Sequence, residues 1–234
     1  RRSYLVGGLG TFGAMILTYW GAQYIHSGLV SVLFGLTPLM TSVFAALWLG
    51  EDALRPAKLA GMALGVAGLG LVCITGQGTS GHQAVFGIAA LVLAVLVYSA
   101  SLVAMKRIGD SSPPLATTAG TLLVAVPLFV GAWWLMDGRL PRTVAPRAGA
   151  AIVYLGVFGS VLGFALYYYV IKHLEAGKVA LITLITPVLA LLLGHLVNGE
   201  AVGLRVWSGT GLISLGLTVH QWPVLARLLP RARA

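Results

Sequence analysis

Charged residues are scarce in this chain. Asp, Glu, Lys and Arg make up 9% of its 234 residues, whereas they make up about 25% of a typical soluble domain. None of them occurs between Ser3 and Gly50. A soluble fold of this size could not cover its surface with so few charges. The composition therefore excludes a soluble protein and predicts an integral membrane protein that lies in a lipid bilayer.

Clusters of catalytic or metal-binding side chains are also lacking. We find no convergent group of His, Asp, Glu or Cys of the kind that an enzyme or a metal site needs, so no catalytic residue, cofactor or metal is predicted. The single cysteine, Cys73, lies in an apolar run and is expected to be an inert buried thiol. The net charge of +9 comes from short clusters rather than a stripe, which argues against a nucleic-acid partner.

Alternation of apolar and polar residues, which a transmembrane β-barrel requires, is absent too. The chain instead contains eight apolar stretches, each long enough for a membrane-spanning helix. They cover approximately residues 4–25, 28–49, 57–75, 84–105, 115–136, 149–171, 177–198 and 206–224. The predicted fold class is an all-α polytopic membrane protein with eight transmembrane helices.

The basic residues between these spans predict the orientation, because Lys and Arg are enriched in cytoplasmic segments. With the N-terminus in the cytoplasm, the inner segments hold Arg1, Arg2, Arg55, Lys58, Lys106, Arg107, Lys172, Lys178, Arg227, Arg231 and Arg233, and the outer segments hold Arg139, Arg142, Arg147 and Arg205. This distribution favours two cytoplasmic termini. The loop at 137–148 argues the other way, since it carries three of the outer arginines.

Residues 36–51, LTPLMTSVFAALWLGE, place a proline early in an apolar run that ends in Gly-Glu. The pattern returns as ITPVLALLLGHLVNGE at 185–200, where Pro187 follows Pro38 by 149 positions. The Gly-Glu pair recurs at the same offset, and the correspondence extends to the flanking helices. The three helices within 4–75 are therefore predicted to repeat within 149–224.

Two more helices, 84–105 and 115–136, precede the second copy, and their counterparts would precede residue 1. We therefore expect ten helices in two five-helix repeats, with eight of the helices in this chain. Residues 1–76 would hold the last three helices of the first repeat, 84–224 the complete second repeat, and 225–234 a basic cytoplasmic tail. Because five is odd, the repeats must insert in opposite directions, an arrangement typical of secondary transporters.

With these blocks, the sequence resembles the EamA family of drug/metabolite transporters. The resemblance rests on GLVSVLFGLTPLMTSVFAALWLGE at 28–51, AGKVALITLITPVLALLLGHLVNGE at 176–200 and the glycine-rich helix after each. It covers nearly the whole chain. The resemblance implies an inverted-repeat bundle with a central cavity, a location in the bacterial inner (plasma) membrane and, often, export of amino acids, drugs or other small metabolites. It does not imply a particular substrate.

The paired prolines are predicted to break their helices, because each leaves the carbonyl four residues earlier without a hydrogen bond. These carbonyls belong to Phe34 for Pro38 and to Thr183 for Pro187. In lipid such a break must face protein or a wet cavity, and symmetric breaks point to a transport site. The alternative is that both prolines only kink their helices for packing.

Candidate substrate-binding residues are the hydroxyl-bearing and aromatic side chains near these breaks and on neighbouring helices. They are Tyr19, Ser31, Phe34, Thr37, Tyr98, Thr121, Tyr168, Thr183 and Thr186, with Ser99, Ser101, Thr117 and Thr118 as further candidates. Close helix packing is the alternative role for the small residues, and anchoring at the membrane interface is the alternative for the tyrosines.

Gly50 and Gly199 are expected to end their helices, as glycine often does. Glu51 and Glu200 follow them and have structural roles in this interpretation. Each would hold the loop after it by hydrogen bonding, or pair with the next arginine along the chain.

Carboxylates are missing from the predicted spans, which argues against ion coupling through an intramembrane acid. His195 is the deepest titratable residue and is either a proton carrier or a hydrogen-bonded packing residue.

The sequence thus predicts a secondary transporter that moves a small metabolite, amino acid or drug-like solute across the inner membrane by alternating access, with export as the expected direction. A cavity with hydroxyls and aromatic rings but no fixed charge favours a neutral, zwitterionic or amphiphilic solute. A structural or signalling membrane protein without transport activity is the main alternative, and a membrane enzyme is a weaker one. A homodimer is left open.

Overall fold

The computed structural model of the chain is built from helices, as its apolar stretches predict. It describes residues 1–51, 56–74, 83–136, 138–139, 143–162, 166, 176–200 and 202–226. Within these ranges every regular element is a helix and no strand occurs. The all-α prediction is confirmed for this part of the chain.

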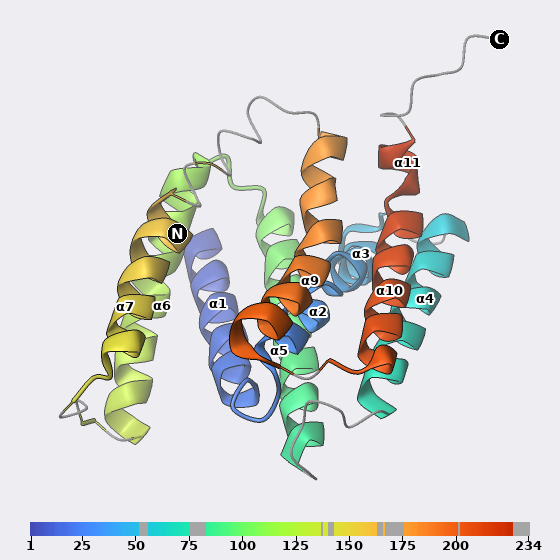
Figure 1. The fold of residues 1–234 in the computed structure, drawn as a ribbon. Coiled ribbons are helices and arrows are strands. Elements are labelled where there is room, and N and C mark those ends of the chain that lie inside the picture. Colours follow the sequence, from blue (N-terminus) through green and yellow to red (C-terminus); the bar gives the residue numbers. More distant parts are fainter. Residues whose placement is uncertain are drawn as a thin grey trace.

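The helices follow one another as labelled in Figure 1. They are α1 (Arg2–Gly21), α2 (Ser27–Phe34), α3 (Thr37–Leu49), α4 (Pro56–Ile74), α5 (Gln83–Ile108), α6 (Pro114–Met136), α7 (Pro146–Tyr154), the π-helix η1 (Leu155–Leu162), α9 (Ala176–Asn198), α10 (Leu204–His220) and α11 (Trp222–Leu225). Three of them begin at a proline, where the missing N–H removes no intrahelical hydrogen bond.

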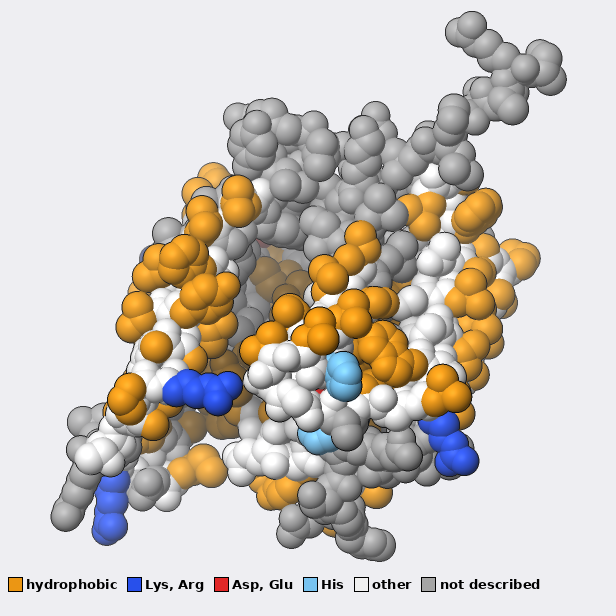
Figure 2. Space-filling model, in the orientation of Figure 1, with side chains coloured by type: hydrophobic (Ala, Val, Ile, Leu, Met, Phe, Trp, Pro, Cys, Tyr) orange, Lys and Arg blue, Asp and Glu red, His pale blue; other side chains and the backbone are white. Residues whose placement is uncertain are grey.

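Among the described residues, three helical segments are long and apolar enough to cross a membrane. They are Ser27–Leu49, which combines α2 and α3, Ala84–Ile108 and Leu115–Met136. Helices also occupy the described parts of the other predicted spans, but they are shorter or less apolar. Figure 2 shows hydrophobic side chains spread over the sides of the molecule, a surface that suits lipid better than water.

The bundle has two ends that differ in which connections they carry. In Figure 1, α1 begins and α11 ends in the upper part of the molecule, and the connection 109–113 between α5 and α6 lies there too. We call this end the terminal face. The opposite end, the hairpin face, carries the turn 22–26 between α1 and α2 and the end of α9 near Glu200.

The first close helix contact joins α1 to α5 and α6. A Cβ atom built on Gly10 would lie 2.1 Å from the Cβ of Ser101, and one built on Gly7 would lie 2.6 Å from Oγ1 of Thr121. Only glycine fits at such distances. Its absence of a side chain lets the helix backbones approach closely, as in other membrane bundles.

The second close contact joins α4 to α10. A Cβ built on Gly61 would lie 2.5 Å from the carbonyl oxygen of Gly216, and one built on Gly68 would lie 2.6 Å from that of Gly209. In the sequence repeat, whose offset falls by one residue to 148 after the Gly-Glu pair, Gly61 corresponds to Gly209 and Gly68 to Gly216. The contact is therefore reciprocal, since each glycine touches the repeat counterpart of the other.

The buried core lies around α2 and joins it to α5, α9 and α10. Its members are Ile25, Leu29, Val32, Leu33, Leu36, Leu39, Val72, Ile88, Leu91, Val95, Leu191, Val206, Ile213 and Leu217. The short helix α2 is thus held inside the bundle, as its strongly apolar sequence favours.

A helix break lies at the first proline. α2 ends at Phe34 and α3 begins at Thr37, with Gly35 and Leu36 between them. Pro38 is the second residue of α3, where a proline is well tolerated. Pro38, which was predicted to interrupt a helix, therefore lies in the first turn of one.

The second proline behaves differently. α9 runs through Pro187 without interruption, so the predicted second break is wrong. The residue three positions before Pro38 is Gly35, whereas the residue three positions before Pro187 is Leu184. Glycine weakens a helix by about 1 kcal/mol relative to alanine, and leucine hardly does. The broken helix packs against the continuous one, because the Cγ atom of Pro187 lies 3.0 Å from a Cβ atom built on Gly35.

Gly50 and Gly199 end α3 and α9. Their φ angles are 66° and 65°, in the left-handed region that only glycine adopts readily. The N–H of the following residue donates to a carbonyl six positions earlier, over 3.3 Å for Glu51 and 3.1 Å for Glu200. At both ends the chain therefore turns back after the glycine and satisfies a carbonyl of the last helical turns.

Candidate functional site

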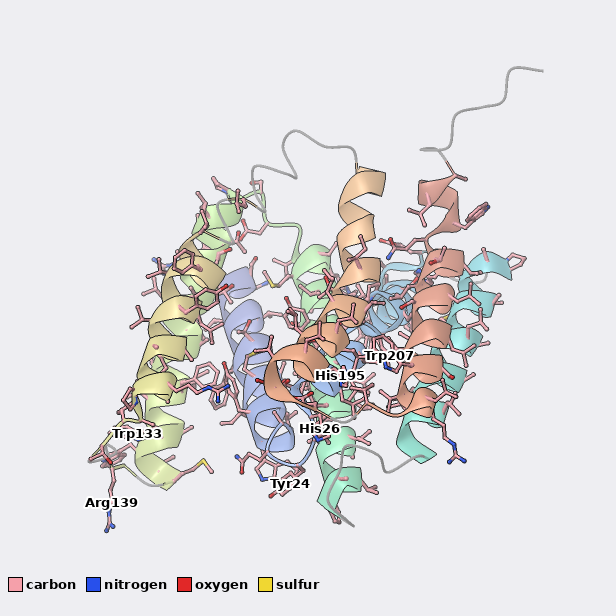
Figure 3. All side chains as sticks on the ribbon, in the orientation of Figure 1. Tyr24, His26, Trp133, Arg139, His195 and Trp207 are labelled. Atoms are coloured by element: carbon pink, nitrogen blue, oxygen red, sulfur yellow. The ribbon has the colours of Figure 1, made fainter. Side chains whose placement is uncertain are left out.

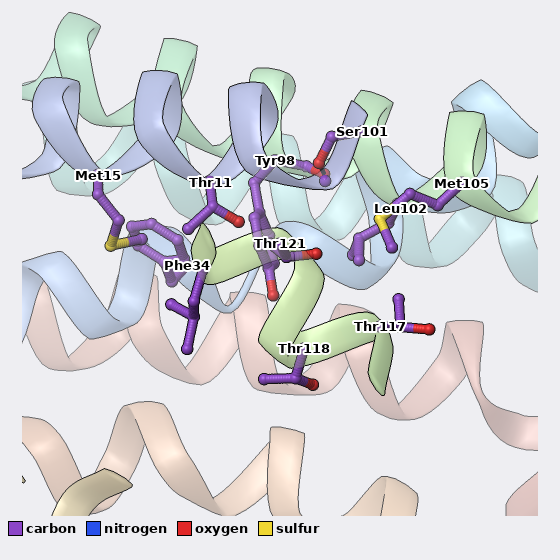
Figure 4. A pocket seen from close by; sticks show the side chains of 12 residues that line it. Thr11, Met15, Phe34, Tyr98, Ser101, Leu102, Met105, Thr117, Thr118 and Thr121 are labelled. Atoms are coloured by element: carbon purple, nitrogen blue, oxygen red, sulfur yellow. Dashed lines mark hydrogen bonds between the residues drawn. The ribbon is translucent and has the colours of Figure 1, made fainter. Parts of the chain in front are cut away.

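A cavity of about 390 Å³ lies between α1, α5 and α6, next to the end of α2. It is lined by Gly7, Thr11, Met15, Phe34, Tyr98, Ser101, Leu102, Met105, Thr117, Thr118, Thr121 and Leu122. Figure 4 shows their side chains coming from these four helices. Its upper end lies near Met105 and Thr117, one turn from helix ends at the terminal face. The cavity therefore lies in the half of the bundle that faces the termini.

The described residues that line this cavity are amphipathic and include no Asp, Glu, Lys, Arg or His. Hydroxyl groups come from four threonines, one serine and Tyr98, and apolar surface comes from the methionines, the leucines and Phe34. The hydroxyl of Ser101 donates to the carbonyl oxygen of Tyr98 over 2.8 Å, so its oxygen can still accept a bond. Such a lining can hold an uncharged polar group and an apolar body side by side.

Two aromatic rings lie where the cavity meets the helix break. The ring centroids of Phe34 and Tyr98 are 6.4 Å apart, with an angle of 58° between the ring planes. Phe34 is the last residue of α2. A change in the bend between α2 and α3 would therefore move an aromatic side chain of the cavity wall.

The structure brings together three of the nine main candidates for substrate binding. Phe34, Tyr98 and Thr121 line the cavity, as do the further candidates Ser101, Thr117 and Thr118. Tyr19 is 66% exposed, Thr186 is also exposed, and Ser31 and Thr37 are half-buried outside the lining. Tyr168 and the side chain of Thr183 lie outside the described residues.

Sequence reasoning missed one side of this cavity. Gly7, Thr11 and Met15 line it from α1. A spacing of four places them on one helix face, which was the available signal. Gly8, Gly10 and Gly13 beside them serve the helix contact instead of a ligand, because Gly8 and Gly10 face α6 and α5.

On the hairpin face, Glu200 binds the start of α2. Its Oε1 atom accepts hydrogen bonds from the backbone N–H of Ser27 over 3.1 Å and from the Ser27 hydroxyl over 2.5 Å. Its Oε2 atom accepts a third from the N–H of Gly28 over 3.3 Å. The carboxylate therefore holds an element far away in the sequence, rather than its own loop or Arg205.

These contacts shift the acidity of Glu200. Burial of the carboxylate raises its pKa, but the hydrogen bonds from Ser27 and Gly28 and the nearby His26 outweigh this effect. The pKa of Glu200 therefore lies below its ordinary value of 4.5. His26 and His195 lie near the lower ends of α2 and α9 in Figure 3.

On the terminal face, Glu51 pairs with Lys106 from the last turn of α5. Lys106 Nζ lies 2.5 Å from Glu51 Oε1, and the two side chains are 64% and 41% exposed. The hydrogen bond from Lys106 lowers the pKa of Glu51, desolvation opposes this, and the charges of Lys106 and Lys58 lower the pKa further. Glu51 thus uses a partner on a different helix.

His195 lies away from the cavity, at the hairpin face. Its Nδ1 atom is 2.8 Å from the carbonyl oxygen of Glu200, a contact that helps to hold the turn after α9. Among the described residues, no three His, Cys, Asp or Glu side chains lie close enough to bind a metal ion.

The sequence matches the model of the EamA-like transporter family over residues 2–74 and 85–220. The resemblance inferred from the two Thr-Pro…Gly-Glu blocks is therefore confirmed. The match leaves out only the ends and the connection before α5, so it covers both copies of the repeat.

Similar proteins include several transporters. The chain is 26% identical to an uncharacterized transporter of Archaeoglobus fulgidus over 90% of its own length and 75% of that protein. It is 26% identical to the uncharacterized inner membrane transporter YedA of Escherichia coli K12, over 82% of its length and 60% of YedA. A protein of Streptantibioticus cattleyicolor named "Probable terminal-alkyne amino-acid exporter" is 28% identical, with 84% and 64% covered.

The chain thus spans less than two thirds of most of these relatives. A chain of known crystal structure shares its fold, with a TM-score of 0.64 and 22% identity, over 94% of this chain and 76% of that one. Similarity to inner membrane transporters and the long apolar helices together support an integral membrane protein.

Proposed function

This chain belongs to the EamA-like transporter family, and from that premise we propose that it forms a secondary transporter that exports a small metabolite across the inner membrane by alternating access. The cavity beside the helix break is the observation that carries this proposal. A solute held there would contact Phe34 at the end of α2, so binding and the bend of the broken helix would be coupled.

The lining of the cavity favours a neutral or zwitterionic solute with an apolar part. No charged side chain occurs among the described lining residues, so a multiply charged solute would lose its hydration there without a compensating partner. A volume of about 390 Å³ suits a solute of the size of an amino acid or a small drug. The name of the Streptantibioticus relative, an amino-acid exporter, agrees with this class.

We also propose that the complete bundle has two inverted five-helix repeats. The reciprocal contact between α4 and α10 supports this, since a two-fold relation between the copies produces such a contact. A second support comes from glycine pairs 149 positions apart. Gly7 and Gly10 pack against α5 and α6, whereas no described residue of another element lies within 4 Å of a Cβ atom built on their counterparts, Gly156 and Gly159.

In the repeat, η1 therefore corresponds to α1. Among the described residues, it has no neighbours equivalent to α5 and α6. Two helices encoded before residue 1 would supply them. Upstream coding sequence with two apolar stretches of about 20 residues each is expected. An in-frame stop codon close before the Arg1 codon would contradict this architecture.

We place the terminal face in the cytoplasm, because the sequence assigns 11 of the 15 basic residues to the predicted segments on the side of the termini. The cavity then lies in the cytoplasmic half of the bundle, and the hairpin face is the outer face. The structure would correspond to a state that exchanges solute with the cytoplasm.

Transport in proteoliposomes that contain the full-length protein tests this function. A panel of neutral, zwitterionic and anionic metabolites is loaded, and efflux is compared with empty liposomes. Thr121→Trp fills the cavity and is expected to stop transport, whereas Leu123→Trp adds the same bulk at a side chain that is 76% exposed and leaves transport unchanged. A protein that inserts and folds but moves no solute would favour a structural or signalling role.

A further inference from the structure

The helix α2 begins without a cap from its own residues. His26 precedes it but makes no side-chain hydrogen bond to it, and no acidic residue lies in its first turn. The first N–H groups of a helix have no intrahelical acceptor, so they need a partner from elsewhere. A negative charge is the favoured partner because of the helix dipole.

Glu200 is this partner. It accepts hydrogen bonds from the N–H groups of Ser27 and Gly28 and from the Ser27 hydroxyl. The side chain of Asn198 adds a hydrogen bond from Nδ2 to the Ser27 hydroxyl over 3.4 Å. The end of α9 is thereby fastened to the start of α2, and the hairpin face is closed at this point.

In the repeat, the glutamate and the helix start have counterparts on the terminal face. There the glutamate comes before the helix start in the sequence. Glu51 corresponds to Glu200, and Ala176 and Gly177 correspond to Ser27 and Gly28, all at an offset of 149. α9 begins at Ala176 just as α2 begins at Ser27, and its first turn also has no acidic residue. Glu51 is thus equivalent to a residue that caps the start of a helix.

The two glutamates nevertheless have different partners in this structure. Glu200 binds the start of α2, whereas Glu51 is paired with Lys106 and its side chain is 41% exposed. The cavity is found in the half of the bundle next to Glu51. The face with the helix cap is therefore the face away from the cavity.

We propose that Glu200 and Glu51 are alternate locks of the two faces. In the state seen here, Glu200 caps α2 and closes the hairpin face, while Lys106 holds Glu51. In the other state, Glu51 leaves Lys106 and caps the start of α9, which closes the terminal face, and Glu200 releases α2. This inference rests on the proposed alternating access and names the residues that regulate it.

Two arrangements of this kind can be nearly equal in free energy, which transport requires. Each state contains one charge-assisted helix cap, so the change of state replaces one cap by another of the same kind. Lys106 compensates the free carboxylate in one state. Loss of one cap should therefore shift the balance between the states by about tenfold.

Thiol labelling in vesicles tests the locks without any knowledge of the solute. In the full-length protein with Cys73→Ala, Ser31→Cys reports on the pathway one turn inside the hairpin face, and Thr118→Cys reports on the cavity. A membrane-impermeant maleimide is applied from either side. Glu200→Gln is expected to raise labelling of Ser31→Cys from the hairpin side about tenfold and to reduce labelling of Thr118→Cys from the terminal side.

The ion pair of Glu51 and Lys106 gives the sharpest comparison, because both partners can be changed separately. Lys106→Gln frees Glu51 to cap α9, so it is expected to raise labelling of Ser31→Cys. Glu51→Gln removes that cap, so it leaves labelling of Ser31→Cys low and reverses the effect of Glu200→Gln in the double variant. An ion pair that only stabilised the fold would give the same result whichever partner was changed.

Asp110→Asn is the matched control, since this carboxylate also lies at the terminal face but binds Ser112 in its own loop and Ser3 on α1 instead of a basic side chain or the start of α9. It should leave both reporters unchanged. Equal effects of Lys106→Gln and Glu51→Gln, or no reversal in the double variant, would overturn the locks even if the protein transports solutes. Opposite shifts without any solute transport would support the locks and count against the transporter function.

Discussion

The hydroxyl of Ser99 on α5 donates a hydrogen bond of 3.3 Å to the carbonyl oxygen of Thr37, the first residue of α3. Ser99 is fully buried, with 0% of its surface exposed. The bond ties the break between α2 and α3 to the helix that also supplies Tyr98 and Ser101 to the cavity. The geometry of the break and that of the cavity wall are therefore linked through one side chain.

Ser99→Ala is expected to lower the free energy of unfolding by about 1 kcal/mol, which is the usual net value of one hydrogen bond. For a chain of this size this corresponds to a fall in Tm of about 2–4 °C. Thermal unfolding in detergent measures it. Ser111→Ala, in the exposed connection after α5, makes the same chemical change and should leave the Tm unchanged.

Gly216→Ala is expected to destabilise the contact between α4 and α10 by about 1–3 kcal/mol, because a methyl group there must displace backbone. The added Cβ would lie 2.6 Å from the carbonyl oxygen of Gly61. Gly211→Ala on the same helix is the control, since no described residue lies within 4 Å of a Cβ at that position. It should leave the Tm unchanged or raise it, because alanine favours a helix by about 1 kcal/mol over glycine.

Thr121→Val and Thr118→Val are expected to weaken binding of a polar neutral solute by about fivefold each, since each removes a hydroxyl from the cavity lining. Binding is measured by the solute concentration that gives half-maximal transport in proteoliposomes. Thr218→Val is the matched control, because its hydroxyl bonds to the carbonyl oxygen of Ser214 on α10. A loss of binding in the control as large as in the cavity variants would contradict the assignment of the cavity.

The cap formed by Glu200 predicts a pH dependence. Since the pKa of Glu200 is lowered in the folded protein, the cap contributes stability at neutral pH and loses it as the pH falls below 4.5 through this lowered value. The difference in Tm between the unmodified protein and Glu200→Gln should therefore be present at pH 7 and vanish on acidification. His26 lies close to this carboxylate, and the same comparison in a His26→Gln background separates the effect of that histidine. A Tm difference that persists after full acidification would argue against the carboxylate cap.

The sequence by itself determined the class of the protein and its helical segments. Few charges, and none between Ser3 and Gly50, leave a bilayer as the surroundings. The Gly-Glu pairs marked the ends of α3 and α9, because a left-handed residue after a helix favours glycine for local steric reasons. The repeat and the family resemblance followed from residue identities at a constant offset. All these features depend on short segments and their order.

The tertiary structure alone decided which side chains meet. The periodicity of a helix shows which residues share a face, but not how that face is turned toward other helices. Phe34, Tyr98 and Thr121 therefore came together in the cavity, while Tyr19 became exposed, although all four were equal candidates in the sequence. Small residues that pack helices and small residues that line a cavity also look alike along the chain.

The partner of Glu200 could not be predicted from the sequence either. Its carboxylate binds Ser27, 173 positions earlier, because the packing of α9 on α2 brings a free carboxylate to uncapped N–H groups. Local spacing suggested Arg205 instead. Sequence separation carries no information about such a contact, since the packing of helices between the two residues determines the distance.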